Sequence, residues 1–233
     1  MDKLSLSITS YNRFDLTINS FKNVINDNRI DDILILDDGS TDGSFENLKE
    51  YFKDNKKIRV LSQVITKKSQ LNKKDAVELS LNDWVILLDS DNVITSSYLD
   101  AIPSILDDNC IYTASWVKPQ FDFRKYQNIV FNRDTIKDYI KIETFPSLLS
   151  ACMNDGNYLC NKNVYLKNFK YNPEILGADV INHLYNHFKN DGVLTVVENL
   201  HYDHLVHDGS MFLANVDKNM KDAKTIETQF LEL

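Results

Sequence analysis

The chain has 233 residues and carries 26 basic against 34 acidic side chains, a formal net charge of −8. This acidic balance argues against nucleic acid as a partner. Hydrophobic residues make up 43% of the chain, which is enough for the core of one large domain or of two closely joined halves.

No apolar run approaches the roughly 20 residues that a membrane-spanning helix needs. The first residues, MDKLSLSITSYN, lack the apolar core of a signal peptide. Three cysteines without CxxC spacing, Cys110, Cys152 and Cys160, indicate reduced thiols rather than a disulfide framework. We therefore expect a cytoplasmic protein. Peripheral contact with the inner face of the membrane is compatible with this composition, because a few exposed lysines and aromatic residues leave little trace in it.

The first part of the chain alternates between strand and helix patterns. Short apolar runs predict four strands, at residues 4–8, 32–36, 58–64 and 84–88. Helical spacing of apolar side chains predicts three helices between them, at 15–27, 45–52 and 70–81. Such alternation implies a mostly parallel sheet with right-handed crossovers.

Polar loops follow the first, second and fourth of these strands. They comprise Thr9–Arg13, Asp37–Ser44 and Asp89–Asn92. Open α/β sheets bind their ligands at the carboxyl ends of the strands, and parallel strands bring those ends to one edge. We therefore expect the three loops to meet in one cleft, with Asp38 and Asp91 around a single pocket.

Paired acids stand at the ends of two of these strands, and Asp89-Ser90-Asp91 directly follows the buried run Trp84–Leu88. Two carboxylates one residue apart repel each other unless a cation or hydrogen-bond donors compensate. A hard divalent ion bound to a phosphate is the usual compensation. A plain turn is the alternative, because Asp and Ser are common turn residues. Neither GxGxxG nor GxxxxGK[ST] follows any strand, so a nucleotide would bind through carboxylates and a metal rather than a glycine-rich cradle.

The second part of the chain is less regular. Its patterns predict helices at 96–106, 163–168 and 180–188, strands at 111–117, 156–160 and 193–197, and a helical tail after Ser210 that docks on the body. Residues 119–133 are rich in aromatics, which would either wall a binding site or form a packed loop or β-ribbon. Asp179 stands at a helix start, where an acid can also serve only as a cap or dipole partner.

Several stretches, in this order, resemble the family-2 glycosyltransferases of the GT-A fold: SITSYNR, ILDDGSTDGS, NKKDAVELSLNDWVILLDSDNVI and GNYLCNKNVYLKNFKYNPEILGAD. The resemblance spans residues 4 to about 210. It implies an α/β fold with a mostly parallel central sheet flanked by helices and a smaller acceptor-side half. The whole chain would be one GT-A domain, with a nucleotide-binding half at 1–95, an acceptor-binding half at 96–210 and a C-terminal tail at 211–233.

The resemblance also implies roles for the residues of the first half. Thr9, Tyr11 and Arg13 would line the nucleotide pocket, with Tyr11 near the base. Asp38 would accept the uracil N3–H, while Asp37 shapes the turn. Asn72 and Lys73 occupy the position where the family contacts the donor, although the family's glycine is missing there.

The acids would carry the remaining roles. Asp89, grouped with Ser90 on the donor side, would approach the ribose or a metal-bound water, and Asp91 would ligate Mn²⁺ or Mg²⁺. Asp179 matches the acid that deprotonates the acceptor. The family commonly has Glu-Asp at this position, whereas this chain has Ala178-Asp179.

Three histidines near the carboxyl end, His201, His204 and His207, are spaced three apart, so that at least two could share one face of a turn or helix. No cysteine cluster accompanies them, which disfavours structural zinc. Related GT-A enzymes often use a C-terminal histidine as a further ligand of the metal or diphosphate, and His204 and His207 are the candidates. The alternative is loop histidines that only form hydrogen bonds. We interpret His183 and His187 as structural.

The resemblance implies a metal-dependent, inverting hexosyltransferase. It would move a sugar from a nucleotide sugar, preferably a UDP-sugar, to a hydroxyl of a glycan or glycolipid, such as a surface polysaccharide precursor. A divalent ion would stabilise the leaving diphosphate, and a carboxylate would act as general base. One alternative is a nucleotidyltransferase, although only Arg13 is available near the first strand to bind a triphosphate. A second alternative is a catalytically silent binding module. Ala178 and the missing glycine near Asn72 favour this alternative.

Overall fold

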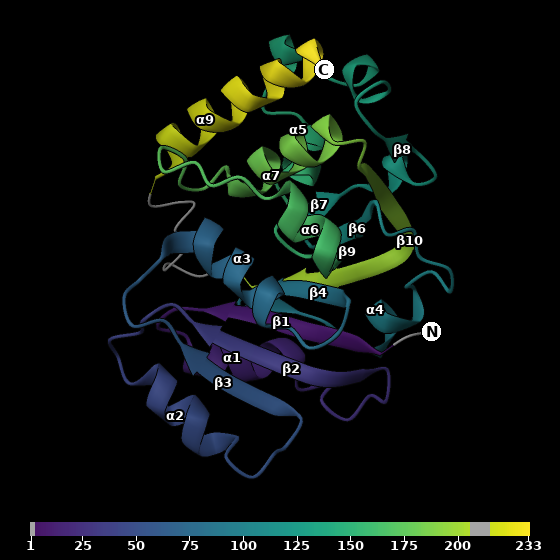
Figure 1. Ribbon diagram of the computed structural model, residues 1–233. Coiled ribbons are helices and arrows are strands. Elements are labelled where there is room, and N and C mark those ends of the chain that lie inside the picture. Colours follow the sequence, from purple (N-terminus) through teal and green to yellow (C-terminus); the bar gives the residue numbers. More distant parts are fainter. Residues whose placement is uncertain (1–2, 206–214) are drawn as a thin grey trace.

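The computed structural model describes residues 3–205 and 215–233. A mixed sheet runs through this described part, with the strand order β3-β2-β1-β4-β9-β6-β10-β5, while β7 pairs with β6 and β8 with β10. Helices lie on both sides of the sheet (Figure 1). The expected α/β architecture with a central, mostly parallel sheet flanked by helices is confirmed.

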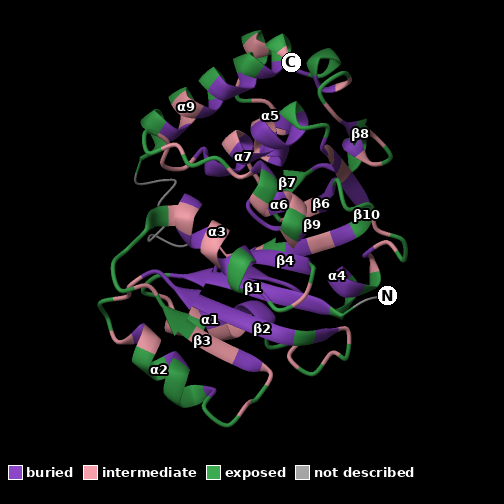
Figure 2. Cartoon of the chain, viewed as in Figure 1, coloured by how far each residue is buried: buried purple, intermediate pink, exposed green. Residues whose placement is uncertain are grey.

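The amino-terminal part of the sheet is parallel. It consists of β1 (Leu4–Ser10), β2 (Ile30–Asp37), β3 (Ile58–Ser62) and β4 (Trp84–Asp89), with β1 between β2 and β4. The sequence LSLSITS of β1 is buried along its whole length, as expected for a strand covered on both faces. Figure 2 shows the same continuous burial in the centre of the sheet, with exposed residues gathered on outer helices such as α2 and α9.

The helices of this part are α1 (Phe14–Phe21), α2 (Ser44–Tyr51), α3 (Lys68–Leu79) and the short α4 (Ser96–Asp100), which follows the two-residue strand β5 (Asn92–Val93). Two expected helices, 15–27 and 96–106, are shorter than predicted. After Phe21 the chain turns with i→i+3 hydrogen bonds, such as Val24 N to Phe21 O. α4 ends before Pro103, because proline disfavours helical backbone at the residue before it and has no N–H to donate.

The carboxyl-terminal part adds β6 (Cys110–Lys118), β7 (Phe121–Asp122), β8 (Val130–Phe131), β9 (Tyr158–Asn161) and β10 (Val193–His204). Its helices are α5 (Leu148–Met153), α6 (Lys162–Asn168), α7 (Asp179–Lys189) and α9 (Val216–Gln229), with short 3₁₀ turns η1 (Arg124–Tyr126), η2 (Ile136–Asp138), η3 (Ile142–Thr144) and η4 (Phe230–Glu232). β9 lies antiparallel between β4 and β6, so one sheet joins the two parts of the chain.

β10 is longer than the predicted strand 193–197 and continues to His204. Side chains alternate between the faces of a strand, so His201 and His204, three positions apart, point to opposite faces. The expectation that two of the three histidines share a face is therefore wrong for this pair. His207 lies outside the described residues.

The aromatic segment 119–133 forms the packed ribbon, not a wall of the cavity described below. Phe123, Tyr126 and Phe131 are buried, and the Phe121 ring stacks on Phe123 with 6.0 Å between centroids. Within the described chain, the residues that line the cavity come from other segments. Phe123 and Phe131 belong to the main hydrophobic core instead.

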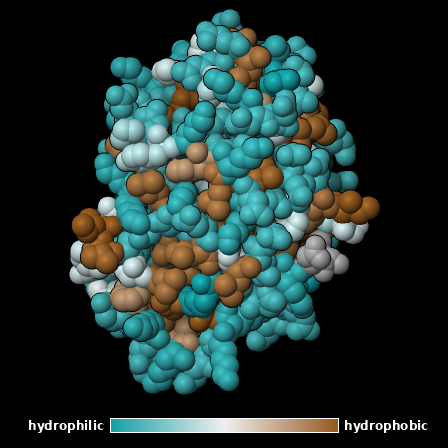
Figure 3. Space-filling model, in the orientation of Figure 1, coloured by the Kyte–Doolittle hydropathy of each residue, from teal (hydrophilic) through white to brown (hydrophobic). Residues whose placement is uncertain are grey.

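The carboxyl-terminal helix α9 docks on the body, as its amphipathic pattern suggests. Ser150 Oγ of α5 donates to Glu227 Oε2 at 2.6 Å, and Gly177 N donates to Asn219 Oδ1 at 2.9 Å. On the face drawn in Figure 3 hydrophilic side chains cover most of the surface, and hydrophobic ones gather mainly in its lower half, where β2 and β3 lie. None of the helices in the described part of the chain has the length and hydrophobicity to cross a bilayer.

Candidate active site

A cavity of about 310 Å³ opens at the carboxyl ends of β1 and β4. Its walls come from the loops after β1 and β2, the first turns of α3, the segment before β9, the start of α7 and the end of β10. Asp38 and Asp91 both line it, so the two acids lie around one pocket, as expected from the sequence. The other candidate residues in its lining are Thr9, Tyr11, Arg13, Asn72, Lys73, Asp89, Asp179 and His204.

The pairing of β1 with β4 places the first loop against the acid pair. Thr9 lies opposite Asp89 in the register, and Thr9 Oγ1 donates to Asp89 Oδ1 at 2.8 Å. The guanidinium of Arg13 reaches Asp91 Oδ2 at 3.1 Å. Tyr11 is 38% exposed at the rim of the cavity, where its ring is accessible to a ligand.

The acids at the end of β2 have separate tasks. Asp37 is fully buried and holds the turn, since its Oδ1 accepts hydrogen bonds from Gly39 N (3.0 Å) and Ser40 N (2.8 Å). Asp38 faces the cavity, and its two oxygens accept the backbone N–H groups of Lys67 and Lys68 at 2.8 and 3.1 Å. Burial raises the pKa of Asp38, and these two N–H groups oppose the rise.

One face of α3 points into the cavity. Ser69, Asn72 and Lys73 are spaced i, i+3 and i+4, the spacing that brings side chains together on a helix. Ser69 Oγ donates to Asp179 Oδ2 at 2.8 Å. Asn72 is 3% exposed, and its Nδ2 makes a long 3.4 Å contact with Leu36 O.

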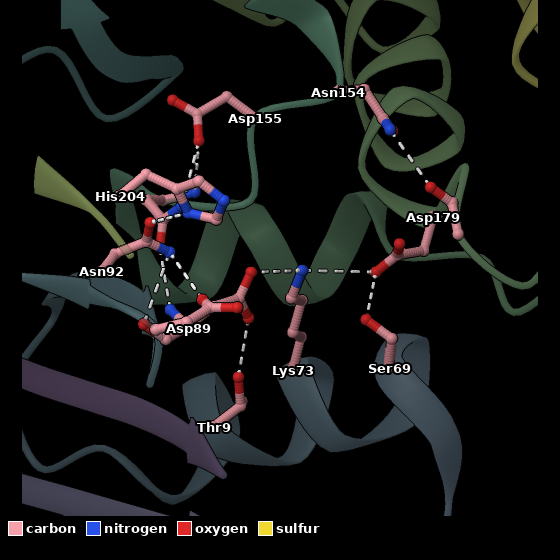
Figure 4. A network of polar contacts seen from close by, with 12 residues as sticks. Thr9, Ser69, Lys73, Asp89, Asn92, Asn154, Asp155, Asp179 and His204 are labelled. Carbon is pink, nitrogen blue, oxygen red and sulfur yellow. Dashed lines mark hydrogen bonds and ion pairs between the residues drawn. The ribbon is translucent and has the colours of Figure 1, made fainter. Parts of the chain in front are cut away.

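Asp179 is the first residue of α7 and is 8% exposed. The loop that presents it is fixed from behind, because Asn154 Nδ2 donates to Gly177 O (3.1 Å) and Ile181 N donates to Asn154 Oδ1 (3.3 Å). Gly177 is required there, since an added Cβ would come within 2.5 Å of the Asn219 side chain. Figure 4 shows Asp179 and Asp89 on opposite sides of Lys73.

The acid pair after β4 is held by a polar network from the segment before β9 and from β10 (Figure 4). Asn157 Oδ1 accepts Asp89 N at 2.8 Å, and the Asn157 side chain donates to Asp155 Oδ1 at 3.1 Å. Tyr202 OH also donates to Asp155 Oδ1, at 2.6 Å. Burial raises the pKa of Asp155, while the hydrogen bonds from Tyr202 and Asn157 oppose the rise.

Ser90 is the one predicted donor-side residue in the described chain that does not reach the cavity lining. It is fully buried, and no hydrogen-bond partner for its hydroxyl is found among the described residues. Ser90 belongs to the turn after β4, and there Asp89 and Asp91 line the cavity while the Ser90 side chain is packed inside the fold. Its backbone N–H donates to Thr9 O at 3.1 Å and joins the two loops.

His204 is oriented by Asn92. The Asn92 Nδ2 group donates to Asn157 Oδ1 (3.0 Å) and Asp91 Oδ1 (3.1 Å), so its oxygen faces His204 Nδ1 at 2.8 Å. Because that oxygen only accepts, Nδ1 is the nitrogen that donates to it, and in the neutral imidazole Nε2 then holds the lone pair. This is the arrangement that a metal-ligating histidine needs.

The side chains of the cavity fit a divalent ion that is held partly by the protein and partly by the oxygens of a diphosphate. In the described chain no group of three or more His, Cys, Asp or Glu side chains could hold a metal alone. Mg²⁺ and similar ions on nucleotides need only one or two carboxylates, with phosphate oxygens and waters completing the shell. Asp91 and His204 both line the cavity and are linked through Asn92, so they suit that partial role.

Sequence reasoning missed the residues that support the site. They are Ser69, Asn92, Asn154, Asp155, Gly156, Asn157 and Tyr202. Most come from the segment before β9, whose position depends on the antiparallel pairing of β9 with β4. The feature of the sequence that could have indicated this segment is the glycine at position 156. The structure gives its reason, because an added Cβ there would lie 2.6 Å from Lys73 Nζ and 2.8 Å from Asp89 Oδ2.

Comparison with known families identifies the chain. The family model described as glycosyl transferase family 2 matches residues 5–161, well over half of the sequence. The chain belongs to glycosyl transferase family 2. It is a glycosyltransferase, and the family resemblance expected from its motifs is confirmed. A search of curated proteins finds no match.

Solved structures with the same fold include GT-A glycosyltransferases. The mannosyltransferase PcManGT from Pyrobaculum calidifontis, in complex with GDP-Man and Mn²⁺, superposes with a TM-score of 0.65 at 9% identity over 98% of this chain and 69% of that one. S. aureus TarS 1-349, in complex with UDP-GlcNAc, gives 0.67 at 12% identity over 98% of this chain and 70% of that one. At these identities the likeness concerns the fold, and it confirms the GT-A architecture.

Proposed function

We propose that this glycosyltransferase moves a sugar from a nucleotide-sugar donor to a hydroxyl of a glycan or glycolipid, with inversion at the anomeric carbon. The observation that carries the proposal is the single cavity lined by Asp38, Asp91 and Asp179, three acids from distant parts of the sequence. Two proteins of the same fold supply further support, because their complexes contain GDP-Man and UDP-GlcNAc.

In this proposal the loops after β1 and β2 bind the nucleoside. The Tyr11 ring is accessible at the rim, and the Asp38 carboxylate is available to a ring N–H of the base. Uracil and guanine carry such an N–H beside a carbonyl, whereas cytosine does not, so the pocket suits a UDP- or a GDP-sugar. The family resemblance favours a UDP-sugar, and GDP is tested beside it. Thr9 and Asp89, joined by their hydrogen bond, would meet the ribose.

The diphosphate lies next to Asp91 in this arrangement. Asp91 and the Nε2 atom of His204 would share a Mn²⁺ or Mg²⁺ with it, and Arg13, Asn72 and Lys73 stand beside them. When bound, the ion would neutralise charge that develops on the leaving diphosphate. The expected role of His207 concerns a residue outside the described part of the chain.

Asp179 is the proposed general base. Its carboxylate lines the same cavity as Asp38, and the Ser69 hydroxyl and the loop bonds from Asn154 hold it in place. An acceptor hydroxyl loses its proton as it attacks, so a fixed carboxylate within hydrogen-bond reach accelerates that step. Attack from the side opposite the diphosphate gives the inverted linkage.

In this proposal the acceptor would enter from the half assigned to residues 96–210, and the half assigned to residues 1–95 would bind the nucleotide. We place the reaction in the cytoplasm, because the three cysteines are buried free thiols, as expected in a reducing compartment. A glycolipid acceptor would bring the enzyme to the inner face of the membrane.

Two measurements test the proposal. Thermal-shift titrations with UDP, GDP and CDP, each with and without Mn²⁺, should show stabilisation by UDP or GDP that Mn²⁺ increases. Donor turnover by the wild type and Asp179→Asn should then differ by a factor of at least about 100, the usual contribution of a general base. No diphosphate binding, or equal turnover by the two proteins, contradicts the assignment.

A further inference from the structure

A lysine lies at the centre of the cavity, between the two acids to which different tasks are assigned. The Lys73 side chain is 8% exposed, and its Nζ atom lies 3.3 Å from Asp89 Oδ2 and 3.6 Å from Asp179 Oδ2. Figure 4 shows the ammonium in line between these carboxylates. Asp89 lies on the donor side and Asp179 is the proposed general base, so the Lys73 ammonium lies next to residues that act on both substrates.

The lysine is charged in spite of its burial. Burial alone lowers the pKa of Lys73, but the neighbouring carboxylates of Asp179 and Asp89 outweigh it and raise the pKa above its ordinary value. Both ammonium–carboxylate distances exceed the usual 2.7–3.2 Å of a hydrogen bond. The ammonium is therefore held mainly by charge, and a better oxygen acceptor can draw it away.

The charge balance of the cavity makes such an acceptor important. Within the described lining, five acids (Asp38, Asp89, Asp91, Asp155 and Asp179) face two strong bases (Arg13 and Lys73). A nucleoside diphosphate adds further negative charge to this space. Its binding requires cations that can turn toward it, and Arg13 already pairs with Asp91 at the metal side.

Lys73 lines the cavity, so its ammonium faces the space that a ligand would occupy. On its other side it packs closely against Gly156, where an added Cβ would come within 2.6 Å of Lys73 Nζ. The neighbouring Lys74 points elsewhere and pairs with Glu78 at 2.5 Å. The two adjacent lysines of α3 therefore have different environments, and Lys74 provides a matched control.

We infer that Lys73 is a charge switch between the donor and the base. In the empty site its ammonium neutralises Asp89 and Asp179 together. When a diphosphate enters, its oxygens take over the ammonium, and Asp179 loses its ion pair and becomes available to the acceptor hydroxyl. This exchange makes the base active only when the donor is present, which protects against unproductive binding of the acceptor alone. The inference rests on the proposed donor site.

A double-mutant cycle on ligand affinity tests the switch. Isothermal titration measures UDP or GDP, whichever binds the wild type better, and the matching nucleoside at a fixed Mg²⁺ concentration. Lys73→Met should weaken diphosphate binding at least about tenfold and leave nucleoside binding unchanged, because a charge-assisted contact to phosphate is lost. Asp179→Asn should tighten diphosphate binding at least about threefold when Lys73 is present, since the lysine no longer shares its charge.

The same Asp179→Asn change should give clearly less tightening in the Lys73→Met background. If Asp179→Asn tightens diphosphate binding equally with and without Lys73, the effect is general repulsion between the Asp179 carboxylate and the diphosphate. That result overturns the inference. So does a loss of nucleoside binding equal to the loss of diphosphate binding, which indicates a purely structural lysine. Should Lys73→Met fail to fold, Lys73→Gln takes its place with the same expectations.

The control variant Lys74→Met should bind both ligands like the wild type, and a loss of diphosphate affinity as large as that of Lys73→Met contradicts a specific role for Lys73. Wild-type protein that binds no nucleoside diphosphate refutes the proposed function and this inference together. Wild-type binding of the diphosphate combined with unchanged affinity in Lys73→Met refutes the inference alone. The two failures are thus distinguishable.

Discussion

The buried His183 of α7 provides a quantitative prediction about stability. It is 4% exposed, its ring lies 4.1 Å from the Tyr165 ring centroid, and neither ring nitrogen has a hydrogen-bond partner among the described residues. Burial, and secondarily the neighbouring His187, lowers the pKa of His183 from 6.5 to about 3. Replacement by phenylalanine keeps the ring contact and removes the titration.

The sign follows from the protons that each state binds. Between pH 6.5 and about 3 the unfolded chain protonates this histidine and the folded chain does not, so stability falls as the pH falls through this window. One pKa unit corresponds to about 1.4 kcal/mol. At pH 5, about 1.5 units below the unfolded value, His183 should therefore cost about 2 kcal/mol of unfolding free energy relative to pH 7.5.

Urea unfolding at pH 7.5 and pH 5.0 measures this cost. The wild type and His183→Phe share all other titrating groups, so the difference between their losses isolates the histidine. His183→Phe should lose about 2 kcal/mol less than the wild type between the two pH values. It should also be at least as stable at pH 7.5, because no hydrogen bond is removed. Equal losses in the two proteins would refute the assignment of His183 as a buried neutral ring.

Three further predictions concern the cavity. Gly156→Ala should abolish most nucleoside diphosphate binding in a titration while leaving the urea midpoint nearly unchanged. The added Cβ would displace the end of the Lys73 side chain and the Asp89 carboxylate, not the backbone. An unaltered affinity would show that this crowding is harmless. Asp91→Ala should remove the Mn²⁺-dependent part of thermal stabilisation by UDP, and full retention of that part excludes Asp91 as a ligand. Asn92→Ala should weaken Mn²⁺ binding by roughly tenfold in the presence of UDP, because His204 loses the acceptor that fixes the proton on its Nδ1. Electron paramagnetic resonance of Mn²⁺ measures this affinity. An unchanged affinity would show that another group sets the tautomer of His204.

The regular half of the fold could be predicted because its signals are local. Each parallel strand is a short apolar run buried on both faces, and β1, β2 and β4 appear within a few residues of their predicted bounds. The errors fall where a signal is weak or competes with another. The helix beginning at Ser96 continues as an apolar pattern beyond Asp100, but Pro103 outweighs that pattern.

Strand patterns alone predict the site only as far as its acids follow such strands, while the family resemblance pointed to Lys73, Asp179 and His204. Asp38, Asp89 and Asp91 stand at strand ends, so sheet topology alone gathers them. Ser90 shows the limit of this reasoning, because its backbone joins two loops while its side chain turns into the core. Its neighbours in the sequence did not reveal which way each side chain of the turn would point.

Lys73 shows a second limit, which concerns charge. The net charge of −8 says nothing about where acids accumulate, and only the fold places five of them around one cavity. Asp89 and Asp179 reach the lysine from β4 and α7, elements that no local pattern relates. A lysine on a helix is ordinarily a solvated side chain, whereas burying Lys73 carries a desolvation cost that its two carboxylate partners offset. In the proposed exchange a diphosphate takes the place of those carboxylates.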